Sequence, residues 1–142
     1  SMGFGLPAAL AAKVHDSSRF VLCFAGDGDF QMNGNEMGTA LQAGLNPVIL
    51  IINNASYGTI RMHQEREYPT RVSGTAIVNP DYMAIAAAYG FHGERVTETG
   101  QFADAYRRAC DSPTGAIVEI LTSTEAISPR TTITALRAAA GK

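Results

Sequence analysis

The chain has 142 residues, of which 46% are hydrophobic and 17% are charged, and its formal net charge is -2. This length and composition predict one globular domain with a core of its own, and neither a nucleic acid nor a membrane as partner. The two cysteines form no CxxC motif, so we expect Cys23 and Cys110 to be reduced, buried thiols of a cytoplasmic protein, a disulfide or a reactive thiol being the alternative.

The first half of the chain predicts a helix, a strand, a second helix and a second strand. Pro7 fits the first turn of an Ala-rich helix within residues 1–15. The short apolar runs at 20–25 and 48–52 are bounded by Gly or Asn, which is typical of buried strands in a parallel sheet. The helical spacing of residues 29–44 predicts the crossover between these strands.

Both predicted strands end on polar residues. Asp27 follows the first strand within Gly26-Asp27-Gly28, and Asn54 follows the second. Ligands of open parallel sheets bind beyond the carboxyl ends of the strands, and Asp and Asn offer the oxygen donors that Mg²⁺ or Ca²⁺ prefers. The amides from Gly28 onward open a helix, where a phosphate group is favoured. The sequence therefore predicts a metal-bridged phosphate site.

Gly-Asp-Gly, 24 further residues (29–52) and Asn-Asn together resemble the signature of thiamine diphosphate enzymes. The resemblance is to the C-terminal diphosphate-binding domain of the acetolactate synthase, benzoylformate decarboxylase and glyoxylate carboligase group. It implies that Mg²⁺ is bound by Asp27, Asn54 and the main-chain carbonyl of Ser56, with two diphosphate oxygens and a water completing an octahedron. The alternative is an Asp in a turn and an Asn pair in a loop, placed there for conformational reasons.

The resemblance also implies which other residues contact the cofactor. Met2 lies 25 positions before Asp27, where the family carries a bulky aliphatic residue beneath the bent cofactor. The loop after the Asn pair is expected to wrap the diphosphate. The remaining expected contacts are Gly26, Gly28, Asp29, Tyr57, Gly58 and Thr59.

Two residues depart from the pattern of many relatives. A second carboxylate near a diphosphate is repulsive, so we expect Asp29 to point away, to cap a helix or to lie behind the metal. Glyoxylate carboligase-like members also carry Asp at this place. His63 stands where synthases of larger keto acids carry Trp. It is a candidate proton carrier beside the substrate, and a surface histidine at the channel rim is the alternative.

The second half of the chain begins with residues 67–80, which are rich in turn formers and predict a mobile loop. The resemblance implies that this loop helps to cover the active site. Further helices and strands are predicted after it. The expected elements are a helix at 81–89, a strand at 92–96, a helix at 101–110, a strand at 116–121 and a helix at 133–140. The order of elements predicts an α/β fold, a parallel sheet covered by helices on both faces. The resemblance makes this a Rossmann-like thiamine diphosphate-binding domain spanning 1–142.

The resemblance implies that this domain anchors thiamine diphosphate and Mg²⁺ in a decarboxylase or carboligase of small 2-oxo acids. A pyrimidine-binding domain, of the same or a neighbouring subunit, supplies the Glu that activates the cofactor in this family. Neither that domain nor the middle domain, which holds FAD in some relatives, is found within these 142 residues. We therefore expect a C-terminal fragment, inactive alone, of a homodimeric or homotetrameric enzyme, or else one subunit of a split enzyme.

Two alternatives come from other classes of protein. In a haloacid dehalogenase-type phosphatase, Asp27 and Asp29 would be the nucleophile and acid, but Gln31 stands where Thr or Val is expected. That fold also needs a nucleophile strand near its N-terminus, and none is predicted. The other alternative is a non-catalytic ligand-binding module.

Overall fold

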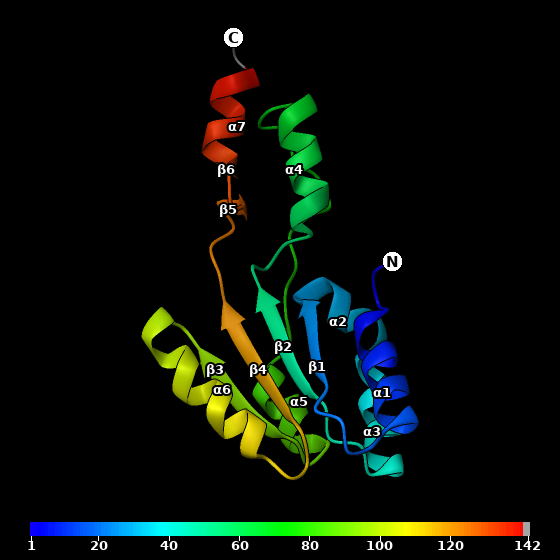
Figure 1. The fold of residues 1–142 in the computed structure, drawn as a ribbon. Helices are drawn as coiled ribbons and strands as arrows, with labels where there is room; N and C mark the ends of the chain where they lie inside the picture. The colour runs from blue at the N-terminus through cyan, green and yellow to red at the C-terminus, as the bar shows by residue number, and fades with distance from the viewer. Residues whose placement is uncertain (141–142) are drawn as a thin grey trace.

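The computed structural model describes residues 1–140, which form a four-stranded parallel sheet between helices (Figure 1). The strands are β1 (Leu22–Gly26), β2 (Val48–Asn53), β3 (His92–Val96) and β4 (Ala116–Leu121), in the order β1-β2-β4-β3. Central strands buried on both faces need no polar alternation, which is why β2 is a continuous apolar run up to Asn53 and β4 is apolar apart from Glu119. The predicted α/β fold is confirmed.

The register of the sheet sets the ends of its strands at one level. Gly26 of β1 pairs with Ile52 of β2, and Ile52 pairs with Ile120 of β4. Asp27 follows β1 directly, and Asn54 follows β2. Because parallel strands share the direction of their carboxyl ends, both residues emerge at the same edge of the sheet.

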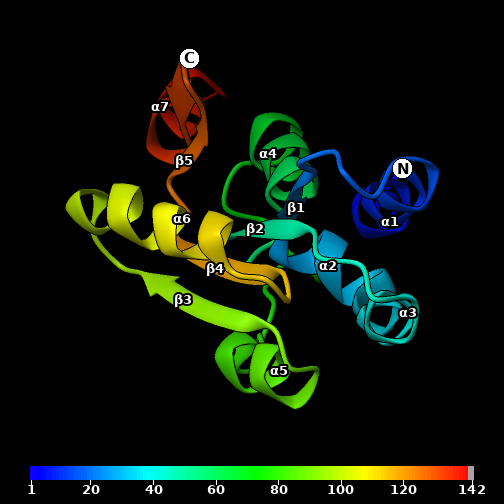
Figure 2. The same ribbon diagram turned by 60° about the horizontal axis from the view of Figure 1, so that its bottom comes forward.

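Helices cover both faces of the sheet (Figure 2). One face packs against α1 (Gly5–His15), α2 (Asp27–Asn33), α3 (Met37–Ala43) and α5 (Tyr82–Ala88). On the other face α6 (Phe102–Asp111) lies over β3 and β4, where its Ala105 and Ala109 are buried with Val118. Phe102 and Tyr106 of this helix pack against the same cluster, and the helix predicted at 101–110 is confirmed.

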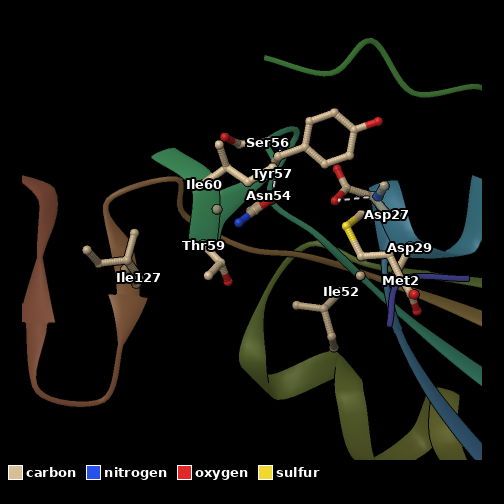
Figure 3. Close-up of a pocket in the computed structure, with 14 residues that line it drawn as sticks. Met2, Asp27, Asp29, Ile52, Asn54, Ser56, Tyr57, Thr59, Ile60 and Ile127 are labelled. Carbon is tan, nitrogen blue, oxygen red and sulfur yellow. Dashed lines mark hydrogen bonds between the residues drawn. The ribbon is translucent and has the colours of Figure 1, made fainter. Parts of the chain in front are cut away.

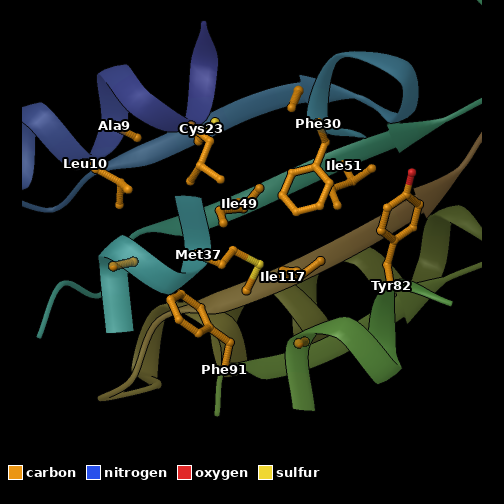
Figure 4. Close-up of a cluster of buried hydrophobic side chains, with 14 of the residues drawn as sticks. Ala9, Leu10, Cys23, Phe30, Met37, Ile49, Ile51, Tyr82, Phe91 and Ile117 are labelled. Carbon is orange, nitrogen blue, oxygen red and sulfur yellow. The ribbon is translucent and has the colours of Figure 1, made fainter. Parts of the chain in front are cut away.

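The larger core cluster lies between the sheet and the first group of helices (Figure 4). Ile49, Ile51 and Ile117 of the central strands are fully buried, and each such side chain contributes about 1.5–3 kcal/mol. The fully buried ring of Tyr82 meets Phe30 edge-on, with ring centroids 5.7 Å apart and planes at 81°. This contact holds α5 against α2, close to the strand ends.

The region predicted as one helix over residues 29–44 is divided by a 3-10 turn at Gly34–Glu36. A Cβ atom at Gly34 would lie 3.0 Å from the ring of Phe30, so the chain packs its backbone directly on that ring. The second half of the region, α3, ends at Gly44 with φ 63°, a left-handed conformation that glycine adopts without steric penalty.

Two helices stand side by side beyond the carboxyl ends of the strands (Figure 1): α4 (Gly58–Glu67) and α7 (Ile133–Ala140). The carboxylate of Glu65 on α4 is fully buried and accepts hydrogen bonds of 2.8 and 2.6 Å from Arg137 on α7. These bonds lower the pKa of Glu65 below its ordinary value. An ion pair between residues 72 positions apart thus fixes the C-terminal helix.

The segments around this helix pair contain little regular structure. A short antiparallel hairpin, β5 (Ala126–Ser128) and β6 (Thr131–Thr132), leads into α7 and is too short for an alternating pattern to predict it. Residues 68–80 form a loop, as expected, and a bridge between Ser56 and Ala76 ties this loop to the end of β2. Within residues 1–140, no helix combines the length and hydropathy that crossing a bilayer requires.

Candidate cofactor site

A cavity of about 300 Å³ opens at the carboxyl ends of β1 and β2, lined also by the first turn of α4 and by β5 (Figure 3). Its lining is Met2, Gly26, Asp27, Gly28, Asp29, Ile52, Asn54, Ser56, Tyr57, Gly58, Thr59, Ile60, Ala126 and Ile127. The fold therefore gathers every residue that the sequence predicted as a cofactor or metal contact, although the contacts themselves stay a prediction.

Asp27 stands at the start of α2, directly after β1, and only 2% of its surface is exposed. Its Oδ1 accepts the N–H of Gly28 at 3.0 Å, and its Oδ2 accepts a hydrogen bond of 2.7 Å from the side-chain amide of Asn79. A carboxylate oxygen can accept more than one hydrogen bond or metal bond, so both oxygens retain capacity. The carboxylate is thus fixed in place at the pocket without being saturated.

The chain leaves β2 through a tight turn at Asn54, Ala55 and Ser56. The Oδ1 of Asn54 accepts the N–H of Ser56 at 3.0 Å, and the Oγ of Ser56 donates to the carbonyl of Thr75 at 3.0 Å. Ala55 has φ 52°, a left-handed conformation that costs a residue with a side chain about 1–2 kcal/mol. Backbone strain of this kind is concentrated at functional sites, because the surrounding structure must enforce it.

The donor atoms at this end of the pocket suit a hard cation. They are the carboxylate of Asp27, the amide oxygen of Asn54 and the carbonyl of Ser56, which accepts no hydrogen bond from any residue that the structure describes. No group of three His, Cys, Asp or Glu gathers anywhere in residues 1–140. One carboxylate with neutral oxygens fits Mg²⁺, which keeps waters and phosphate oxygens in its shell, better than it fits Zn²⁺.

The charges around the pocket also require a cation for an anionic ligand. Among the described residues that line it none is Lys, Arg or His, whereas Asp27 and Asp29 are carboxylates. A diphosphate would therefore be repelled unless a metal ion lay between. Further attraction comes from α4, which begins at Gly58 without a side-chain cap, so the amides of Gly58, Thr59 and Ile60 can donate to an anion.

Met2 reaches the pocket because the residue after it is held on both sides. The N–H of Gly3 donates to the carboxylate of Asp29, and the carbonyl of Gly3 accepts a hydrogen bond of 2.6 Å from Asn33. The carboxylate of Asp29 is thus bonded to the N-terminal segment while Asp29 still lines the pocket, and the orientation expected for it stays a prediction. Burial, reinforced by the charge of Asp29, raises the pKa of the nearby Cys23 thiol to about 11.

His63 lies on α4 and is exposed, and it is not among the described residues that line the pocket. Its Nδ1 accepts a hydrogen bond of 2.8 Å from Arg66, because a guanidinium can only donate. Its role as a proton carrier stays a prediction that the pocket geometry does not support.

Sequence reasoning missed four residues behind the pocket: Asn53, Asn79, Tyr82 and Glu119. Asn79 bonds Asp27 across 52 residues, and the hydroxyl of Tyr82 donates to the Oδ1 of Asn79 at 3.0 Å. Burial, and then the charge of Asp27, raises the pKa of Tyr82 to about 12. The one available signal was that Asn53 begins an Asn pair, since nothing in the sequence connects Asn79 with Asp27.

These observations define a domain with an oxygen-lined pocket at the strand ends of a parallel sheet, which suits a phosphate-bearing cofactor. Residues 1–120 match the family model described as thiamine pyrophosphate enzyme, C-terminal TPP binding domain, thiamine pyrophosphate being another name for thiamine diphosphate. The chain belongs to this family. The match disfavours the phosphatase alternative.

Acetolactate synthases are among the proteins whose sequences are similar to this chain. The chain is 36% identical to the large subunit of acetolactate synthase from Cyanidium caldarium. The alignment of 126 residues covers 87% of this chain and 22% of the relative. The chain is 39% identical over 102 residues to the isozyme 2 large subunit of Escherichia coli (strain K12), covering 71% of the chain and 19% of that protein. It is 41% identical over 96 residues to the mitochondrial catalytic subunit of Saccharomyces cerevisiae (strain ATCC 204508 / S288c), covering 68% and 14%. The chain thus spans about a fifth or less of the length of these relatives.

Proposed function

We propose that this domain anchors the diphosphate of thiamine diphosphate through Mg²⁺ bound by Asp27, Asn54 and the main-chain carbonyl of Ser56. The observation that carries the proposal is the pocket itself. It joins these oxygen donors at one end of the sheet, and the described residues that line it include no cationic side chain. A metal ion is then the charge that makes a diphosphate acceptable there.

The remaining lining residues have separable tasks in this proposal. The first-turn amides of α4, at Gly58 and Thr59, donate to phosphate oxygens. Met2 and Ile52 contribute apolar surface to the pocket and exclude water from the cofactor rings. When bound, the cofactor supplies the carbon nucleophile for cleavage or ligation of 2-oxo acids.

We further propose that the domain works within an acetolactate synthase-like enzyme acting on small 2-oxo acids. The support is the similarity to acetolactate synthases, of whose length this chain covers at most 22%. A pyrimidine-binding domain, from the same subunit or a neighbour in a homo-oligomer, then completes the site, and any FAD binds outside this domain. On this proposal the chain alone binds the cofactor without turning over substrate.

Calorimetric titration of thiamine diphosphate into the chain, with and without Mg²⁺, tests the metal anchor. We expect binding that requires Mg²⁺ and that Asp27→Ala and Asn54→Ala both lose. Asn46→Ala is the matched control, because Asn46 lies beside β2 at the opposite end of the sheet. Binding of equal strength without metal, or retained by Asp27→Ala, would contradict the proposal. Turnover of pyruvate by the chain alone would contradict the expected inactivity.

A further inference from the structure

The side chain of Asn79 is saturated by hydrogen bonds behind the pocket. Its Nδ2 donates to Asp27 Oδ2 at 2.7 Å and to Asn53 Oδ1 at 2.8 Å. Its Oδ1 accepts from Gln31 Nε2 at 2.7 Å and from the hydroxyl of Tyr82 at 3.0 Å. An Asn amide has two N–H bonds and two lone pairs, so every position is used.

The direction of these bonds is set by groups that can only accept or only donate. Asn53 Oδ1 also accepts the N–H of Ala55 at 3.0 Å, and Asn53 Nδ2 donates to Glu119 Oε1 at 2.7 Å. Ionised carboxylates accept hydrogen bonds but cannot donate them. Two amides in series therefore link the carboxylate of Asp27 to the carboxylate of Glu119 in one consistent orientation.

The far end of this chain of hydrogen bonds is anchored in the sheet. Glu119 lies within β4 with 2% of its surface exposed, and Arg95 of β3 donates to its Oε2 at 2.6 Å. Arg95 also donates to Asp81, just before α5, at 2.8 Å. The position of Asn79 is thus determined from both sides, by the strands and by the start of α5. A fully satisfied polar network of this kind is rigid.

We infer that Asn79 is a positioning residue that holds the carboxylate of Asp27 for the metal ion. The inference rests on the function proposed above. Asn79 binds Oδ2 of Asp27, and Oδ1, which accepts only the N–H of Gly28, keeps a lone pair for a cation in the pocket. A neutral amide suits this task, because a Lys or Arg in its place would compete with the metal and an Asp would repel the carboxylate.

Two substitutions separate positioning from simple stabilisation. Asn79→Asp keeps the size and the acceptor atom toward Tyr82 but removes the donor to Asp27, and Asn79→Ala removes both. Gln31→Ala is the matched control, since it deletes a partner of Asn79 and leaves the bond to Asp27 intact. The affinity for Mg²⁺ is measured by calorimetry at a fixed concentration of thiamine diphosphate, and the thermal unfolding of each variant is measured without ligand.

We expect both Asn79 variants to bind Mg²⁺ about ten- to a hundredfold more weakly, the usual effect of losing a group that orients a metal ligand, while Gln31→Ala changes little. If Asn79→Ala binds Mg²⁺ as tightly as the wild type, this inference is overturned and the proposed function is not, whatever the variant's unfolding temperature. Absence of metal-dependent binding by the wild-type chain would overturn the proposed function and this inference with it.

Discussion

Gly28 lies directly after Asp27, and its lack of a side chain makes room for the ring of Tyr57. A Cβ atom at this position would lie 2.4 Å from Tyr57 Cε1 and 2.9 Å from Ile77 Cδ1. Ordinary contact begins at 3.4 Å, so in Gly28→Ala the ring must retreat by about 1 Å, the difference between 3.4 and 2.4 Å. Both Gly28 and Tyr57 line the pocket, so this movement changes its shape.

The effect of Gly28→Ala on stability should be small and its effect on the cofactor large. Overpacking typically costs about 1–3 kcal/mol, and the lower half of that range applies because the obstacle is a half-buried ring that can move. Replacing Gly by Ala near the start of α2 offsets up to about 0.5–1 kcal/mol of this cost. We therefore expect a net loss of about 1 kcal/mol in unfolding free energy, measured by urea denaturation, and at least a tenfold loss of cofactor affinity, or about 1.4 kcal/mol.

A double-mutant cycle identifies the ring as the cause. In the Gly28→Ala background Tyr57→Ala should cost about 1 kcal/mol less stability than in wild type, since it removes the obstacle. Additive effects of the two substitutions would refute this reasoning. So would a Gly28→Ala variant that keeps the cofactor affinity of the wild type. A loss above about 3 kcal/mol would show that the backbone moves and not the ring.

Two further predictions concern titratable groups away from the pocket. Arg108 donates hydrogen bonds of 2.6 and 3.0 Å to Glu94 and lowers the pKa of Glu94 from 4.5 to about 2. Because the pKa of Glu94 is lower in the folded state than in the unfolded state, this stabilisation is present above pH 4.5 and is lost as the pH falls toward 2. Glu94→Gln should therefore flatten the pH dependence of the unfolding free energy between pH 4.5 and 2. An unchanged slope would argue against the ion pair. Burial raises the pKa of the Cys23 thiol to about 11. At pH 8 a thiol reagent should therefore modify Cys23 far more slowly than the half-buried Cys110. Equal rates of modification would contradict the burial of Cys23.

The parts of the site that could be predicted are those that follow strand ends. The apolar runs identify β1 and β2, and parallel pairing then brings Asp27 and Asn54 to one edge of the sheet. Met2 was placed by its spacing from Asp27 in a family signature, and the hydrogen bonds of Gly3 explain physically how it reaches the pocket. In these cases a local pattern and one topological rule are sufficient.

The parts that could not be predicted depend on contacts between distant, irregular segments. Asn79 lies in a loop, and no periodicity places a loop side chain beside a residue 52 positions earlier. The pairing of Glu65 with Arg137 is equally remote, because both residues look like ordinary surface charges in the sequence. The position of His63 along α4 keeps it out of the pocket, because that helix begins at Gly58 and its first turn, not the second turn that carries His63, faces the pocket.

The register that pairs Gly26 with Ile52 has a consequence for insertions and deletions in this family. The distance between the donors of Asp27 and Asn54 is set by the lateral spacing of two adjacent strands, about 4.8 Å, and not by the number of residues that join them. Added or lost residues in the turn at Gly34–Glu36 should therefore leave the site unchanged. A single residue inserted within β2 would instead reverse the faces of Asn53 and Asn54, and would turn the side chain of Asn54 toward Glu119 and away from the pocket.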